Sequence, residues 1–122
     1  MTTREELAAI NEGFSRAMAA QDVEAVVAFY TEDARLLSPG KPIIRGRNAI
    51  TAAFREALKD GPADVTFESG EVLEDGSLVV DIGRTTTPRG QGKYVVVYQR
   101  QSDGTLKLAV DAASNDGPPP AT

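Results

Sequence analysis

Apolar residues recur at helical spacing through the first part of the chain. Thr3 and Glu6 have the spacing of a capping box, which predicts a first helix from this box to about Ala20. The face that this helix buries is marked by apolar residues three and four positions apart: Leu7, Ile10, Phe14 and Met18. The chain is therefore expected to begin with an amphipathic helix.

Two more helices are predicted before residue 62. Asp22 can cap a short second helix, and the "TEDA" after that helix is interpreted as an exit turn. The apolar pieces "ARLLSP" and "PIIRG" flank a Pro-Gly and predict a brief strand or hairpin. A third helix follows and ends at Gly61-Pro62, with its apolar face marked by Ile50, Ala53, Phe54, Ala57 and Leu58.

The second half of the chain has the pattern of antiparallel strands. Segments near 64–73, 77–87, 93–101 and 105–113 are rich in Val, Thr and Tyr and are separated by "EDG", "PRGQG" and "SDG". Helices first and a meander last predict an α+β fold in which the helices pack on one face of a curved sheet. A single domain is expected over residues 1–115, and the Pro-rich residues 116–122 are predicted to form a flexible tail.

Composition excludes several kinds of chemistry. The chain has 122 residues, a net charge of −5, no Cys and no His. Hydrolases with a Ser-His-Asp or Cys-His arrangement cannot be built, a metal site is not expected, and the acidic balance argues against nucleic acid as a partner. No apolar run is long enough for a bilayer and the first residues lack the order of a signal peptide, so the expected location is the cytoplasm, without membrane contact.

The order of elements and two long segments resemble a known superfamily. "DVEAVVAFYTEDARLLSPGKPIIRGRNAI" and "DGTLKLAVDAASND" are similar to nuclear transport factor 2-like proteins, and within them to SnoaL-like and steroid delta-isomerase-like proteins. The resemblance implies a cone-shaped, cystatin-like roll in which three N-terminal helices pack on a strongly curved, mainly antiparallel sheet. The open end of such a cone is an apolar pocket, and members include isomerases, polyketide cyclases, dehydratases and non-catalytic binders.

The resemblance also shows what this chain lacks. Ketosteroid isomerases use an Asp to move a proton, and a Tyr and a protonated Asp to stabilise the enolate oxygen. The family pattern places Phe14 at the Tyr, Ser38 at the base and Val96 at the protonated Asp. All three groups are therefore missing, and Ser38 is interpreted as a pocket hydroxyl or a turn residue.

The strand register of the family implies a set of pocket residues, since side chains two positions apart share a face. One strand would contribute Ile82, Arg84 and Thr86, the next Tyr94, Val96 and Tyr98, and the last Ala109, Asp111 and Ala113. The apolar pattern of the last strand favours the opposite face, with Leu106, Leu108 and Val110 inside and Asp111 in solvent. Both orientations of that strand remain open.

Two functions follow from this set. The first is a cofactor-free enzyme that isomerises, cyclises or dehydrates a hydrophobic polycyclic or polyketide-like molecule. In it Asp111 is the acid or base, Arg84 pairs with and orients Asp111, and Tyr94 or Tyr98 donates to a carbonyl. Substrate contacts are expected from Phe14, Ser38, Ile82, Thr86, Val96, Tyr98 and Ala113.

The alternative is a non-catalytic module that binds a small molecule or dimerises with the same fold. In either case both faces of the last strands are apolar enough to predict a twofold homodimer through the outer face of the sheet.

Overall fold

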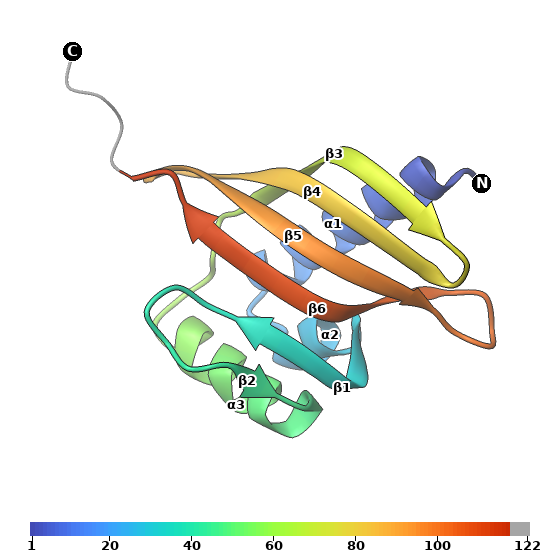
Figure 1. Cartoon of the computed structure of the whole chain (residues 1–122). Helices are drawn as coiled ribbons and strands as arrows, with labels where there is room; N and C mark the ends of the chain where they lie inside the picture. Colours follow the sequence, from blue (N-terminus) through green and yellow to red (C-terminus); the bar gives the residue numbers. More distant parts are fainter. Residues whose placement is uncertain (118–122) are drawn as a thin grey trace, which may run out of the picture.

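The computed structural model describes residues 1–117 and shows an α+β fold, as predicted (Figure 1). Residues 118–122 of the predicted tail lie outside the described residues. The elements in chain order are α1 (Thr3–Ala19), α2 (Val23–Val27), β1 (Tyr30–Leu37), β2 (Ile44–Arg45), α3 (Arg47–Leu58), β3 (Thr66–Asp75), β4 (Leu78–Thr87), β5 (Gly90–Arg100) and β6 (Leu106–Asn115). Two helices precede the first strand and the third follows the short strand β2.

The six strands form one mixed sheet in the order β2-β1-β6-β5-β4-β3. All neighbours are antiparallel except β1 and β6, which are parallel. Helix α1 packs against β3, α3 packs against β1, and α2 contacts both other helices. Figure 1 shows α1 passing behind β4 and β5, so one face of the sheet is covered by helix and the other is open.

Two details of the first third of the chain differ from the prediction. The capping box lies one residue earlier, since Thr2 Oγ1 accepts from Glu5 N at 3.1 Å and Glu5 Oε1 accepts from Thr2 N at 2.9 Å. The "TEDA" segment is not an exit turn but part of β1, because Tyr30 opposite Leu108 starts the parallel pairing with β6. Local turn propensity was overridden by this long-range pairing.

The core is organised around an aromatic side chain of α1. The ring of Phe14 lies 5.3 to 6.2 Å, centroid to centroid, from four other rings, which come from the α2–β1 junction, β1, α3 and β3: Phe29, Tyr30, Phe54 and Phe67. Most of these pairs are tilted or edge-to-face, the arrangements that the ring quadrupole favours. The cluster holds the helices at a fixed distance from the sheet.

Two bulges change which side chains face this core. In β6, Val110 pairs with Val97 and Leu108 pairs with Tyr98, so Ala109 is the extra residue. In β3, the register shifts between Glu68 and Glu71, which leaves Ser69 and Gly70 outside the regular ladder. An extra residue reverses the alternation of the strand beyond it, so each bulge redirects side chains toward or away from the core.

Candidate functional site

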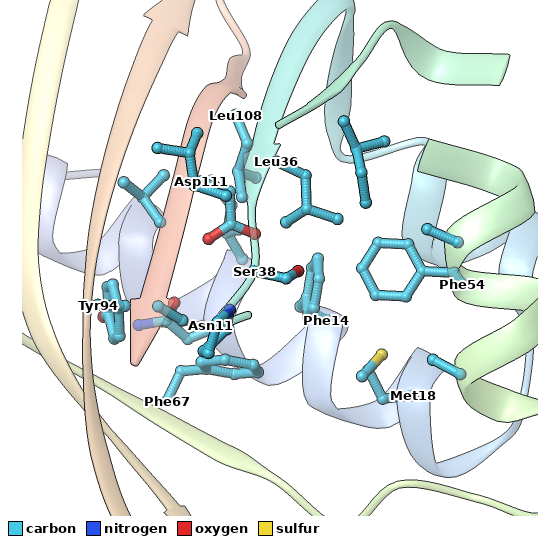
Figure 2. Close-up of a pocket in the computed structure, with 18 of the residues that line it drawn as sticks. Asn11, Phe14, Met18, Leu36, Ser38, Phe54, Phe67, Tyr94, Leu108 and Asp111 are labelled. Atoms are coloured by element: carbon cyan, nitrogen blue, oxygen red, sulfur yellow. The ribbon is translucent and has the colours of Figure 1, made fainter. Parts of the chain in front are cut away.

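A cavity of about 220 Å³ lies between the helices and the inner face of the sheet (Figure 2). Its wall is mostly apolar, and Figure 2 shows Asp111, Tyr94 and Asn11 toward the sheet and Phe54 and Met18 on the helical side. An apolar cavity with a few inward polar groups is the usual form of a small-molecule site.

Asp111 is the acidic side chain of the cavity wall. The bulge at Ala109 explains its position, because Leu106 and Leu108 face the core before the bulge and Asp111 faces the same side after it. The apolar pattern is therefore correct for the first half of this strand, and the family register is correct for the second half. Ala109, which was predicted to face the pocket, is the bulged residue and does not line the cavity.

Within residues 1–117, the carboxyl group of Asp111 has one hydrogen-bond partner. Tyr30 Oη donates to Asp111 Oδ2 at 2.6 Å, and Tyr30 itself is completely buried. Burial raises the pKa of Asp111, and the hydrogen bond from Tyr30 opposes that rise. Asp111 therefore keeps a proton to higher pH than an exposed carboxyl group, which suits an acid or base.

Tyr98 is the second polar group near Asp111. Its side chain is 2% exposed, lines the cavity and, within residues 1–117, forms no hydrogen bond. Burial, followed by the charges around it, raises the pKa of Tyr98, so its hydroxyl keeps its proton. Tyr98 thus offers an O–H donor to a molecule in the cavity.

Tyr94 lies on the same wall, but its hydroxyl is already used. Tyr94 Oη donates to Asp81 Oδ2 at 2.8 Å. Burial, and then the hydrogen bond to Asp81, raises the pKa of Tyr94. Because a phenol has one proton, Tyr94 is not free to donate to a substrate.

Asp81 is a fully buried residue that was not selected from the sequence. Its Oδ2 accepts from Ser69 Oγ at 2.7 Å as well as from Tyr94, and its Oδ1 accepts from Gly70 N at 3.3 Å. The bulge of β3 brings Ser69 and Gly70 to this carboxylate. A charged residue within the apolar "VVDIG" run was the signal in the sequence.

The position of Asp81 corrects the prediction for β4. Asp81 faces inward, so Ile82, Arg84 and Thr86 lie on the outer face of the sheet and do not line the cavity. Arg84 is exposed and its Nη1 donates to Gln91 Oε1 at 2.8 Å. The expected pair of Arg84 and Asp111 is therefore wrong, since the two side chains point to opposite faces.

The other predicted pocket residues do share the cavity. They come from α1, the end of β1, β5 and β6: Phe14, Ser38, Tyr94, Val96, Tyr98, Asp111 and Ala113. Asn11 and Lys41 are polar lining residues that the sequence interpretation did not include. Asn11 could have been found from the apolar face of its helix, where it stands between Ile10 and Phe14.

Two features are absent from residues 1–117: a metal-binding cluster and a membrane-spanning helix. No three His, Cys, Asp or Glu side chains in this part of the chain are grouped so as to hold a metal ion. None of the described helices is both long enough and apolar enough to span a membrane.

Comparison with known proteins gives a family and a set of similar structures. The family described as "SnoaL-like domain" matches residues 11–108. A ketosteroid isomerase-like protein from Erwinia carotovora atroseptica is 23% identical, with a TM-score of 0.73 over 93% of this chain and 94% of that one. Among curated proteins, none matches this chain.

Two further solved structures show the range of this fold. A protein from Catenulispora acidiphila, solved in complex with S-DNPA, is 21% identical with a TM-score of 0.73 over 92% of each chain. A putative calcium/calmodulin-dependent protein kinase type II association domain from Thiobacillus denitrificans is 18% identical with a TM-score of 0.75, over 87% of this chain and 91% of that one. At these identities the likeness concerns the fold.

Proposed function

Because the chain belongs to the SnoaL-like domain family of the nuclear transport factor 2-like superfamily, we propose that its cavity is an active site. The reaction is a cofactor-free proton transfer on a hydrophobic carbonyl compound, of the isomerase, cyclase or dehydratase type. Helices and sheet enclose the substrate in the cone that this superfamily forms. The observation that carries the proposal is Asp111, a carboxyl group with raised pKa in a mostly apolar cavity.

The two oxygens of Asp111 have different tasks in this reaction. Oδ2 is held by the hydroxyl of Tyr30, which fixes the orientation of the carboxylate. Oδ1 has no partner within residues 1–117 and is free to take a proton from a carbon next to a carbonyl group. That C–H bond breaks, its electron pair enters the enolate, and the proton moves to Asp111.

Tyr98 stabilises the charge that develops in this step. Its free O–H donates to the carbonyl oxygen, where the negative charge of the enolate collects. Asp111 then returns its proton to another carbon of the enolate, which gives an isomer. Alternatively, the enolate carbon attacks a second carbonyl of the same molecule, which closes a ring, and Asp111 returns its proton to the oxygen of that carbonyl. Neither outcome needs a cofactor, since electrons and protons balance within the substrate.

The size of the cavity narrows the class of substrate. Pockets for drug-sized ligands have volumes of about 300–1,000 Å³, and this cavity has about 220 Å³. A molecule of one or two rings matches this volume better than a four-ring steroid. The neighbour from Catenulispora acidiphila, which was solved in complex with S-DNPA, supports the use of this fold for ligand binding.

One observation favours a second function, the binding module. Phe14 and Val96 line the cavity where the isomerase pattern has hydrogen-bonding groups, and Ser38 lines it where that pattern has the base. A binding module would use the same wall and would need no proton transfer. The two functions differ in whether a bound ketone exchanges protons.

This difference can be measured with an enolisable two-ring ketone, 2-tetralone, in D₂O. We expect wild-type protein to accelerate the exchange of the protons next to the carbonyl, followed by NMR, above the rate in buffer. Saturable binding of the ketone with exchange at the buffer rate would instead establish the binding module.

Dedicated steroid isomerisation is not expected. Phe14, Ser38 and Val96 occupy the three catalytic positions of the ketosteroid isomerase pattern, so the protein lacks the oxyanion donors and the positioned base with which that mechanism acts on 3-oxo-Δ5 steroids. Formation of the conjugated enone, followed by ultraviolet absorbance, is expected to stay at the rate in buffer. Turnover near that of a dedicated isomerase would contradict the placement of these residues.

We also propose that the chain is a homodimer that buries the open face of its sheet. Two apolar rows cross this face, formed by Ile82, Val95 and Ala112 and by Val80, Val97 and Val110. Val95 is 41% exposed and Ile82 is 39% exposed, so apolar area remains to be covered. Acidic Glu68 and Glu71 lie beside basic Arg84 and Lys93 on the same face, so a twofold copy can place opposite charges together.

The dimer is tested with a charge in the middle of the apolar rows. Val95→Glu is expected to shift the protein from twice the chain mass to the chain mass in light scattering at micromolar concentration, because it buries an unpaired charge at the interface. Ile43→Glu is the control, since Ile43 is also exposed (49%) but lies between β1 and β2. A monomeric wild-type protein at that concentration would refute the proposal.

A further inference from the structure

A chain of hydrogen bonds leads from a buried carboxylate to the wall of the cavity. Asp81 Oδ2 accepts from Ser69 Oγ at 2.7 Å, and Ser69 Oγ in turn accepts from Asn11 Nδ2 at 3.0 Å. Tyr94 Oη donates to the same Oδ2, and Gly70 N donates to Oδ1. Helix α1 is thus joined to β3, β4 and β5 at one end of the cavity, beside Asn11 and Tyr94 in Figure 2.

The carboxylate of Asp81 determines which group donates and which accepts in each hydrogen bond of this network. A carboxylate only accepts, so the single protons of Ser69 and Tyr94 both point at Asp81. The oxygens of these two hydroxyls can then only accept from a further group. Asn11 must therefore turn its amide nitrogen toward Ser69 Oγ, and its carbonyl oxygen is directed away from this hydrogen bond.

The carbonyl oxygen of Asn11 is available to a ligand. Asn11 lines the cavity, and its Oδ1 has no hydrogen-bond partner within residues 1–117. Nor is Oδ1 sealed inside the protein, because among the described residues the one fully enclosed side-chain nitrogen or oxygen without a partner is Arg47 Nε. An accessible acceptor thus belongs to the mostly apolar wall of the cavity.

We propose that Asn11 is a ligand-binding residue whose carbonyl oxygen accepts from a hydroxyl or N–H of the ligand, and that Asp81 determines this preference without touching the ligand. The inference rests on the proposed use of the cavity for a small molecule, and it specifies that molecule further. The ligand carries an oxygen acceptor for Tyr98 and a hydrogen-bond donor for Asn11. Asp81 is a positioning residue, because it acts on Asn11 only through Ser69.

Asp81→Asn is expected to reverse the polarity of Asn11. The N–H of Gly70 can only donate, so the new amide must place its oxygen at the Oδ1 position and its NH₂ at the Oδ2 position. That NH₂ donates to the oxygens of Ser69 and Tyr94, and their protons are released toward Asn11. Asn11 then turns its oxygen to these protons and presents its NH₂ to the cavity.

A matched pair of probes measures this polarity. 2-Naphthol carries a donor and 2-methoxynaphthalene only an acceptor, and the absence of Trp leaves their fluorescence unobscured. The ratio of the dissociation constant of 2-methoxynaphthalene to that of 2-naphthol is expected to exceed one in wild type, by about two- to tenfold, the range of one net hydrogen bond. In Asp81→Asn the ratio is expected to fall to one or below.

Two further variants separate this effect from a general loss of structure. Asn11→Leu is expected to remove the dependence of the ratio on residue 81, so that Asn11→Leu and the double variant Asn11→Leu/Asp81→Asn give the same ratio. Ser69→Ala cuts the link but keeps the carboxylate, and is expected to bring the ratio toward one without inverting it. A loss of folding would weaken both probes together and leave the ratio unchanged.

Each outcome has a definite meaning. If both probes bind and the ratio is the same in wild type, Asp81→Asn and Ser69→Ala, the inference is wrong while the proposed ligand site stands. If Asp81→Asn does not fold, Ser69→Ala alone decides, since an unchanged ratio there contradicts the link through Ser69. If neither probe binds wild type, the proposed ligand site and the inference both fail.

Discussion

Replacing Asp111 with Asn is expected to lower the rate of proton exchange on 2-tetralone by about 10²- to 10⁴-fold, the usual contribution of a positioned acid or base. The amide keeps the size of the carboxyl group, and its oxygen can still accept from Tyr30. It cannot take a proton from carbon. The measurement is the NMR exchange rate of wild type and Asp111→Asn, each corrected for the rate in buffer.

Ligand binding by Asp111→Asn is the control for this prediction. Binding of 2-methoxynaphthalene is expected to stay within about threefold of wild type, because an amide replaces a carboxyl group of equal volume and this probe has no proton to donate to it. Equal exchange rates in the two proteins would rule out Asp111 as the base.

The sign of the stability change follows from the pKa of Asp111. Burial raises this pKa above its ordinary value of 3.8, so the folded protein holds the proton more tightly than the unfolded chain. Wild type therefore loses stability as pH rises from that ordinary value through the raised one. Asn has no such loss, so urea unfolding is expected to show Asp111→Asn more stable than wild type above this interval and similar to it below.

Replacing Gly83 with Ala is expected to cost about 1–3 kcal/mol or more of unfolding free energy, because the new methyl group has no room. Its Cβ would lie 2.3 Å from Cζ and from Oη of Tyr94 and 2.5 Å from the carbonyl oxygen of Glu68. Gly83 pairs directly with Tyr94 across β4 and β5, and the missing side chain is what lets the phenol reach Asp81. Urea unfolding followed by circular dichroism measures the loss.

The control for this variant is Thr86→Ala, an exposed outer position of the same strand. Its effect is expected to stay within about 0.5 kcal/mol, as for most surface substitutions. Since Tyr94 lines the cavity, Gly83→Ala is also expected to weaken naphthalene binding, whereas Thr86→Ala is not. A Gly83→Ala protein as stable as wild type would show that Tyr94 can move without cost.

Most elements of the fold could be predicted because their signals are local. Asp22 caps α2 as predicted, with its Oδ1 accepting from Ala25 N at 3.1 Å, and the four hairpin strands lie within about three residues of the expected limits. The start of β1 was missed because "TEDA" has the composition of a turn. The segment belongs to β1 because Tyr30 and Arg35, on either side of it, pair with β6 about 75 to 80 residues later, which no local pattern encodes.

The site was harder to predict. The alternation of side chains along a strand shows which residues share a face, but it does not show which face lines the cavity. β5 is regular around its three pocket residues, so Tyr94, Val96 and Tyr98 were placed on one wall together. In β4 the same reasoning placed Arg84 in the cavity and Asp81 outside, which is the reverse of the structure. It relied on the family register and overlooked the charged residue in the apolar run "VVDIG". A fully buried carboxylate is tolerated here because three donors reach it, and two of them come from a bulge that the sequence did not reveal.

The bulge at Ala109 implies that the chemistry of this cavity depends on chain length as much as on residue type. Inserting one residue between this bulge and Asp111 would reverse the alternation once more and send Asp111 to the open face, while Leu106 and Leu108 kept their places. A single-codon insertion would thus remove the carboxyl group from the cavity without replacing any side chain. Relatives that differ by one residue in this strand are then expected to differ in activity, even where their pocket sequences align.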